Sequence, residues 1–334
     1  MTSPRTVADV GEFALIEAIR KHFPGPPPGE IWSGDDAAVI RPSDEATVFT
    51  TDVLVENIDF DLGYCPPLSI GYKAMAVNAS DVAAMGGRPG RAVATLSLPP
   101  TTELSLVDEI AQGLAAAGAS MGVDLVGGDL SEASEISLAI AMIGWVESAP
   151  VTRSGAAVGD LICVSGNLGG AAGGLRVLRG GIPDEIRGVK ELVQRQLKPT
   201  PRIEEGLINA ELGATSMIDI SDGLLADLNH VLDASGVGCK VEPQTVPIDE
   251  RLNALAGLLP SDEVDLLDLA MTGGEDFELL FTIPAVRVDD FRREYEVLGT
   301  KLTIIGEIVG NGRLIGTRNL EEWDEKGWQH LRSR

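Results

Sequence analysis

Residues 69–87 read SIGYKAMAVNASDVAAMGG, and this stretch decides the fold of the N-terminal part of the chain. Mostly small and apolar residues run without a proline from Ser69 to Met85, and the pair Gly86-Gly87 supplies a helix stop. The pattern predicts a long helix over 69–85. Near its C-terminal end this helix carries a hydroxyl and a carboxylate, Ser80-Asp81, among residues that are otherwise small or apolar.

Helix and strand patterns alternate on both sides of this segment. Before residue 150 the expected elements are a helix over Val7–Phe23, strands over Ala37–Ile40 and Thr47–Asp52, a strand over Ala92–Leu98, a helix over Leu104–Met121, and strands over Val123–Val126 and Ile136–Val146. After it they are strand Leu161–Ser165, the glycine-rich loop Gly166–Gly174, helix Glu204–Leu212, strand Met217–Ile220, helix Asp222–Ala234, strand Phe277–Ile283, helix Val288–Leu298 and strand Leu302–Ile308.

The length and this alternation predict an α/β (α+β) protein of two domains. A chain of 334 residues exceeds what one core of ordinary size organises. The break falls at Ser148-Ala149-Pro150, which gives an N-terminal α/β domain over 1–149 and a C-terminal α/β domain over 150–334.

Charge and cysteine content exclude several classes of protein. The chain has 51 acidic and 26 basic residues and a formal net charge of -25, which disfavours a nucleic-acid or anionic-membrane partner. The longest apolar stretch, Leu138–Val146, is too short for a membrane helix. Acidic residues in the first predicted helix exclude an ordinary signal peptide. Three cysteines far apart in the sequence indicate reduced thiols, so we expect a cytoplasmic protein.

Aspartates beside glycine, serine or threonine recur where predicted elements begin or end. They occur in Gly34-Asp35-Asp36, Thr50-Thr51-Asp52, Ser80-Asp81, Gly127-Gly128-Asp129, Asp219-Ile-Ser221-Asp222-Gly223 and Gly273-Gly274-Glu275-Asp276. Carboxylate and hydroxyl oxygens are ligands that magnesium takes, and small neighbours let phosphates approach the backbone. Each motif taken singly also fits an ordinary turn or helix N-cap. Their repetition favours a set of magnesium ions that lets an acidic protein bind an anionic nucleotide.

Familiar nucleotide-binding and catalytic motifs are missing from the sequence. There is no G-x-x-x-x-G-K-[ST], and neither Gly310–Gly316 nor Gly166–Gly174 matches G-x-G-x-x-G. Protein-kinase catalytic loops are absent as well. The three histidines have no partners at metal or triad spacing.

The motifs together resemble the thiamine-monophosphate kinase family, which shares its fold with aminoimidazole ribonucleotide synthetase. The resemblance runs in order and spacing from Gly11 to Trp328. It rests on Gly11-Glu-Phe-Ala-Leu-Ile16, Gly34-Asp-Asp-Ala-Ala38, Thr50-Thr-Asp52, Ala76-Val-Asn-Ala-Ser-Asp-Val-Ala-Ala-Met-Gly86, Gly127-Gly-Asp129, Thr152-Arg-Ser-Gly155, Asp219-Ile-Ser-Asp-Gly-Leu224 and Gly273-Gly-Glu-Asp-Phe-Glu-Leu279.

The resemblance implies a two-domain fold and a homodimer whose N-terminal strands build a shared β-barrel. It also implies direct transfer of the γ-phosphoryl group from ATP to thiamine monophosphate, with Mg²⁺ ions as cofactors and K⁺ as a further candidate. The implied magnesium ligands are Asp36, Thr50, Thr51, Asp52, Asp81, Asp129, Asp219 and Asp222. The implied ATP contacts are Gly128, Asp129, Arg153 and Ser221, and the implied catalytic residues are Asp52, Asp129 and Asp219.

Substrate contacts are implied at Asp59, Glu275 and Trp328. Glu275 would complement the thiazolium cation, or else be a turn residue. Trp328 would stack on that cation, or else be a C-terminal packing anchor. Arg153 would offer a planar fork of donors to a phosphate, or else be a surface cation. Asp59 departs from the family, which commonly has a histidine at this position.

Four other functions are alternatives. A selenophosphate synthetase needs a reactive cysteine or selenocysteine in an N-terminal glycine-rich segment, and this chain has none there. A hydrogenase-maturation carbamoyl dehydratase needs a C-terminal cysteine, which is absent as well. An aminoimidazole ribonucleotide synthetase-like enzyme is disfavoured by Gly273-Gly-Glu-Asp276 and by the N-terminal Gly11-Glu-Phe13. A non-catalytic nucleotide-binding regulatory module is disfavoured because a pure binder has no need to keep so many like charges together.

Overall fold

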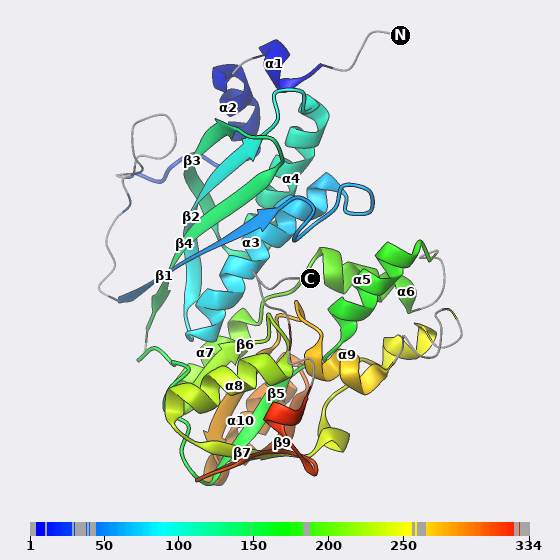
Figure 1. Ribbon diagram of the computed structural model, residues 1–334. Coiled ribbons are helices and arrows are strands. Elements are labelled where there is room, and N and C mark those ends of the chain that lie inside the picture. Colours follow the sequence, from blue (N-terminus) through cyan, green and yellow to red (C-terminus); the bar gives the residue numbers. More distant parts are fainter. Residues whose placement is uncertain are drawn as a thin grey trace. The chain divides into compact units, whose positions relative to one another are not determined.

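The structure is a computed structural model, and the chain divides into two compact units (Figure 1). Unit 1 comprises Met1–Val82 and Arg88–Glu147, and unit 2 comprises Ala83–Gly87 and Ser148–Arg334. The residues that the structure describes are 5–10, 12–28, 30, 38, 40, 45–147, 149–182, 188–255, 258, 265–323 and 327.

Unit 1 is a four-stranded sheet with helices packed on one face. Its elements are α1 (Val7–Val10), α2 (Glu12–Arg20), β1 (Ala46–Val55), α3 (Pro67–Ala84), β2 (Arg88–Leu98), α4 (Leu104–Met121), β3 (Asp124–Glu132) and β4 (Ser137–Val146). The strand order is β1-β4-β2-β3, with β2 and β3 parallel and the other pairs antiparallel.

Glycines let α3 and α4 approach each other backbone to backbone beneath this sheet. A Cβ atom on Gly71 would lie 2.0 Å from the carbonyl oxygen of Ile110, and one on Gly113 would lie 1.9 Å from that of Leu68. Larger residues are therefore excluded at both positions. Alternate residues of β4, including Leu138 and Ile140, are fully buried against these helices, which is the pattern of a sheet with one covered face.

Unit 2 contains a seven-stranded sheet of order β11-β10-β7-β9-β5-β8-β6. Its strands are β5 (Asp160–Ser165), β6 (Ser216–Asp219), β7 (Gly238–Val241), β8 (Leu279–Pro284), β9 (Leu302–Val309), β10 (Arg313–Ile315) and β11 (Arg318–Asn319). Its helices are α5 (Gly170–Gly180), α6 (Val189–Leu197), α7 (Ile203–Leu212), α8 (Leu224–Ser235), α9 (Leu266–Thr272) and α10 (Val288–Leu298), with short 3₁₀ turns η1 (Pro243–Thr245), η2 (Glu250–Leu255), η3 (Ala285–Arg287) and η4 (Leu320–Glu322).

Both faces of this second sheet are covered by apolar clusters. On one face Leu228 and Leu232 of α8 pack with Leu280 of β8. On the other face the ring of Phe281 stacks on Phe291 and on Tyr295 of α10, with ring centroids 6.2 and 5.8 Å apart. Because neighbouring residues of β8 point to opposite faces, the near-continuous apolar run of this strand serves both cores.

Most predicted elements are confirmed, including the α/β class and the long helices α3 and α4. Two bounds differ. Strand β3, predicted over Val123–Val126, continues to Glu132, because Gly127–Glu132 pair with β2 past a bulge in the ladder. The predicted strand Ala37–Ile40 falls partly outside the described residues. Among the described residues, none of the helices has the length and apolar character needed to cross a membrane.

Candidate active site

Strand β1 and the end of helix α3 bring three of the predicted magnesium ligands together in unit 1. The Oγ1 of Thr50 donates a hydrogen bond of 2.5 Å to Oδ2 of Asp81. The backbone N–H of Asp52 donates to Oδ1 of Asn78, at 3.1 Å, one turn before Asp81. Asn78 is fully buried and also donates to the carbonyl oxygen of Ala74. Asn78 therefore fixes the metal-ligand strand to the helix, a role not predicted from the sequence.

The carboxylates of Asp52 and Asp81 interact directly. Burial, the charge of Asp81, a hydrogen bond with Asp81 and the charge of Asp59 raise the pKa of Asp52 to about 7. Two carboxyl groups this close repel each other when both are ionised. A divalent cation relieves that repulsion, and hard oxygens are the donors that magnesium prefers. The donor set of Thr50, Asp52 and Asp81 therefore fits a magnesium ion.

Thr51 and Asp59 lie beside this cluster. The Oγ1 of Thr51 donates to the carbonyl oxygen of Ile140, at 2.9 Å, and strand alternation places Thr51 on the opposite face of β1 from Thr50 and Asp52. Asp59 accepts the N–H of Val55 at 2.8 Å and so closes the turn after the strand. Its electrostatic effect on Asp52 shows that it lies close to the predicted metal cluster.

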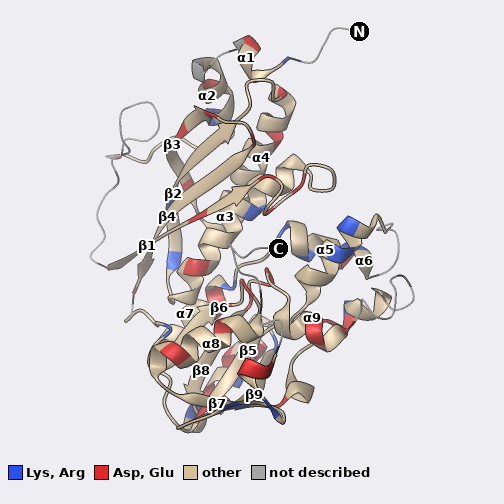
Figure 2. Ribbon diagram, viewed as in Figure 1, with Lys and Arg blue, Asp and Glu red and all other residues tan. Residues whose placement is uncertain are grey.

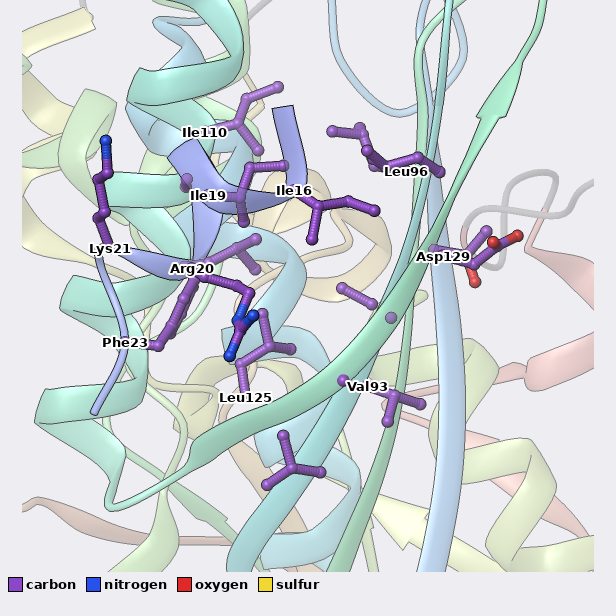
Figure 3. Close-up of a pocket in the computed structure, with 18 of the residues that line it drawn as sticks. Ile16, Ile19, Arg20, Lys21, Phe23, Val93, Leu96, Ile110, Leu125 and Asp129 are labelled. Atoms are coloured by element: carbon purple, nitrogen blue, oxygen red, sulfur yellow. The ribbon is translucent and has the colours of Figure 1, made fainter. Parts of the chain in front are cut away.

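Gly128 and Asp129 lie inside strand β3 rather than in a loop. Asp129 pairs with Thr95 of β2 and is exposed. A Cβ atom on Gly128 would lie 2.1 Å from the carbonyl oxygen of Ala94, so strand packing alone requires glycine here. A cavity of about 1160 Å³ lies between α2, α4 and these strands. Figure 3 shows Ile16, Ile19 and Leu96 on the cavity side of the strands. Asp129 also lines the cavity, and its carboxylate points away from it.

In unit 2 the segment Asp219–Gly223 joins the end of β6 to the start of α8. The buried carboxylate of Asp227, in the first turn of α8, accepts the N–H groups of Asp222 at 3.2 Å and Gly223 at 3.1 Å. Burial and the charges of Asp219 and Asp222 raise the pKa of Asp227 well above its ordinary value. Asp219, Asp222 and Asp227 therefore lie close together, and Asp227 was not predicted from the sequence.

His230 joins this second cluster. Ligand atoms of Asp222, Asp227 and His230 lie within 4.8 Å of one another. The spacing of Asp227 and His230, three residues apart on one helix, is the signal that sequence reasoning passed over. His230 is exposed on α8, so the cluster opens toward solvent.

Backbone hydrogen bonds hold Glu275 beside Ser221. The N–H of Glu275 donates to the carbonyl oxygen of Ser221 at 2.7 Å, and the N–H of Phe277 donates to that of Ile220 at 2.9 Å. These bonds extend the β6–β8 ladder, in which Asp219 pairs with Leu279. The structure thus brings the predicted nucleotide contact Ser221 and the predicted substrate contact Glu275 together in one unit.

Comparison with known proteins places this arrangement in a family. Residues 34–146 match the AIR synthase related protein N-terminal domain, and residues 157–319 match the corresponding C-terminal domain. The chain is 33% identical over 324 residues to the thiamine-monophosphate kinase of Aquifex aeolicus, covering 97% of this chain and 99% of that protein. This chain belongs to the thiamine-monophosphate kinase family.

Solved structures of thiamine-monophosphate kinases support the same assignment. The kinase from Stenotrophomonas maltophilia K279a is 34% identical, with a TM-score of 0.82 over 93% of this chain and 98% of that one. The structure described as AaThiL complexed with AMPPCP and TMP is 32% identical, with a TM-score of 0.78 over 99% of this chain and 100% of that one. The resemblance to the thiamine-monophosphate kinase family is therefore confirmed.

The roles of three predicted site residues in this thiamine-monophosphate kinase family member stay predictions. Asp36 and Trp328 lie outside the described residues. Arg153 is exposed, and its carbonyl oxygen accepts the hydroxyl of Ser235 at 3.3 Å. The preceding Thr152 accepts the N–H of Met217, so the Thr152-Arg153 segment runs beside the strand that ends at Asp219.

The glycine-rich loop before α5 is occupied by a side chain of the kinase itself. Oδ2 of Asp276 accepts the N–H of Gly169 at 2.6 Å, and Oδ1 accepts that of Ala171 at 3.0 Å. Helix N-termini with free N–H groups bind phosphates, but here a buried carboxylate takes that place. This loop therefore serves the architecture of the Gly273–Glu278 segment.

Proposed function

We propose that this chain transfers the γ-phosphoryl group of ATP to thiamine monophosphate, giving thiamine diphosphate and ADP. The observation that carries the proposal is the full-length likeness to AaThiL complexed with AMPPCP and TMP, together with acidic clusters at the positions that the family motifs predict. AMPPCP and TMP correspond to the two substrates proposed here.

Phosphoryl transfer requires in-line placement of donor and acceptor and neutralisation of phosphate charge. In unit 1 the candidate magnesium ligands are Thr50, Asp52, Asp81 and Asp129, and in unit 2 they are Asp219 and Asp222. Bound there, several magnesium ions would supply the positive charge that this acidic chain lacks. The protein's own contribution is to hold these carboxylates in place through Asn78 and Asp227.

Glu275 is proposed to recognise the cationic part of thiamine monophosphate. Its backbone is tied to Ser221, a proposed ATP contact, so acceptor recognition and nucleotide binding would share one rigid ladder. Arg153 is proposed to bind a phosphate and Trp328 to stack on the thiazolium ring.

The test is a product assay with ATP, magnesium chloride and thiamine monophosphate. Thiamine diphosphate and ADP should form in equal amounts. Release of inorganic phosphate with an amide-bearing acceptor would instead assign the chain to the synthetase branch. Nucleotide binding without turnover of any acceptor would favour the regulatory module.

A homodimer through the outer face of the unit 1 sheet is the second part of the proposal. Phe49, Val53 and Val93 are 70%, 51% and 39% exposed, and strand pairing places all three on the face away from α3 and α4. An apolar sheet face of this kind favours burial against a partner. A shared β-barrel of two copies would cover it. We expect a dimer in analytical ultracentrifugation and a monomer for Phe49→Asp, with Glu109→Gln as a dimeric control.

A cytoplasmic location is proposed from the cysteines. Cys65, Cys163 and Cys239 are all buried thiols, which fits a reducing compartment.

A further inference from the structure

Gln196 contacts the proposed substrate-recognition residue from a distant part of the chain. It lies in α6, and its Nε2 donates a hydrogen bond of 2.5 Å to Oε2 of Glu275, 79 residues away in the sequence. Gln196 is only 5% exposed, so water does not compete for this bond. None of the sequence motifs that identify the family includes Gln196.

Glu275 has a backbone conformation that needs outside support. Its φ angle is 69°, in the left-handed region that side chains other than glycine rarely adopt. Such a conformation persists when the surroundings hold it, and it is found most often at functional sites. The N–H of Glu275 is held by Ser221, and a Cβ atom on Gly274 would lie 2.6 Å from the same carbonyl oxygen.

Two acidic residues that follow Glu275 point inward, where hydrogen-bond donors hold them. The carboxylate of buried Asp276 accepts the N–H groups of Gly169 and Ala171. Glu278 is fully buried and accepts two hydrogen bonds of 2.6 Å from Arg202 and one of 3.1 Å from Arg195. Figure 2 shows basic residues gathered on α5 and α6, the helices beside this segment, in a chain that is otherwise rich in acidic residues.

Glu275 differs from these residues in exposure, and its partners include the side chain of Gln196. It is partly exposed, and Gln196 is a neutral amide. An amide donor orients a carboxylate through a charge-assisted hydrogen bond without cancelling its charge. A carboxylate held in this way is prepared for a ligand that carries a delocalised positive charge, because its orientation is fixed before the ligand binds.

We propose that Gln196 is a positioning residue that aims the carboxylate of Glu275 at the cationic ring of thiamine monophosphate, an inference that rests on the proposed function. Gln196 acts through Glu275, so its loss weakens recognition of the acceptor and leaves phosphoryl transfer and ATP binding intact.

The first test compares Gln196→Met with Gln194→Met, an exposed glutamine of the same helix. Methionine keeps the length of the side chain and removes the hydrogen bond. KM for thiamine monophosphate should rise about tenfold in Gln196→Met, the change expected when one charge-assisted hydrogen bond is lost. The turnover number, KM for ATP and the melting temperature should match those of Gln194→Met. An unchanged KM for thiamine monophosphate, or a parallel loss of every kinetic constant and of thermal stability, would overturn the proposal.

The second test is a double-mutant cycle with Glu275→Gln. If Gln196 acts through the carboxylate, Gln196→Met should have no further effect on KM once Glu275 is replaced. Additive effects would show that Gln196 acts elsewhere. Should Gln196→Met fail to fold, Gln196→Leu also removes the hydrogen-bond donor. KM for thiamine monophosphate should rise in that variant as well, and an unchanged KM would overturn the proposal.

Wild-type turnover separates this inference from the proposed function. Absence of thiamine diphosphate with the wild-type chain refutes the proposed function. Normal turnover with an unaltered KM in Gln196→Met refutes the positioning role alone.

Discussion

The hydroxyl of Thr50 donates a 2.5 Å hydrogen bond to the carboxylate of Asp81, and this contact joins strand β1 to the last turn of helix α3. Since Asp52 lies on the same face of β1, the contact places two carboxylates side by side, and burial together with their interaction raises the pKa of Asp52 to about 7. The unit 1 cluster is therefore electrostatically unfavourable until a cation binds it.

Stability without metal should fall as pH rises. In the folded chain Asp52 binds its proton up to a pH of about 7, whereas in the unfolded chain it loses it near the ordinary value of 3.8. The folded state therefore binds more protons between these values, and stability decreases across that window. Asp52→Asn should raise the unfolding free energy at pH 8 by about 1–3 kcal/mol, after allowance for partial exposure. Denaturant unfolding in EDTA at pH 5 and pH 8 measures the free energy of unfolding, and Glu109→Gln serves as the control. Equal stability of the wild type and Asp52→Asn at pH 8 would contradict the prediction.

Magnesium should stabilise the chain through the same cluster. A ligand that binds only the folded state at ~100 times its Kd adds about 2.7 kcal/mol. Thermal scans with and without magnesium chloride should show an increase for the wild type and a smaller one for Asp81→Asn. A shift of equal size in both would exclude Asp81 from the metal site.

Asp129→Asn and Asp219→Asn should each abolish turnover while the fold stays intact. Both replacements remove a negative charge from a proposed magnesium ligand and change the side-chain volume little. The product assay measures the loss, and circular dichroism verifies the fold. Glu132→Gln, at the exposed end of β3, should keep full activity; activity near the wild-type level in either aspartate variant would refute the metal assignment of that residue.

Glu278→Gln should be strongly destabilising. Glu278 is fully buried and pairs with Arg202 and Arg195, so its neutralisation removes the nearest counterion of two mostly covered guanidinium groups. Breaking such a pair costs about 3–5 kcal/mol. The exposed pair of Lys240 and Glu307 gives a matched control, because Glu307→Gln should change stability by less than about 1 kcal/mol. Urea unfolding compares the two, and a small effect of Glu278→Gln would mean that the network does not anchor this segment.

Local sequence patterns predicted most elements because each has a clear start, stop or period. The helix α3 ends at glycines, and α10 has the bounds that its apolar spacing predicts. Strand β7 and helix α6 are among the elements that escaped prediction. β7 is only four residues long, and α6 buries residues such as Gln196 whose polar character hides the covered face.

The sequence by itself determined the α/β class, the family and the acidic residues that the proposed chemistry needs, since these follow from local pattern and motif order. Only the tertiary structure decided which of these residues meet. Asn78 and Asp227 position the candidate ligands, Asp276 fills the glycine-rich loop, and Gln196 orients Glu275. Contacts between residues far apart in the chain depend on how helices and strands pack. That packing is decided by glycines such as Gly71 and Gly113 and by buried apolar faces, and a motif read along one segment does not contain it.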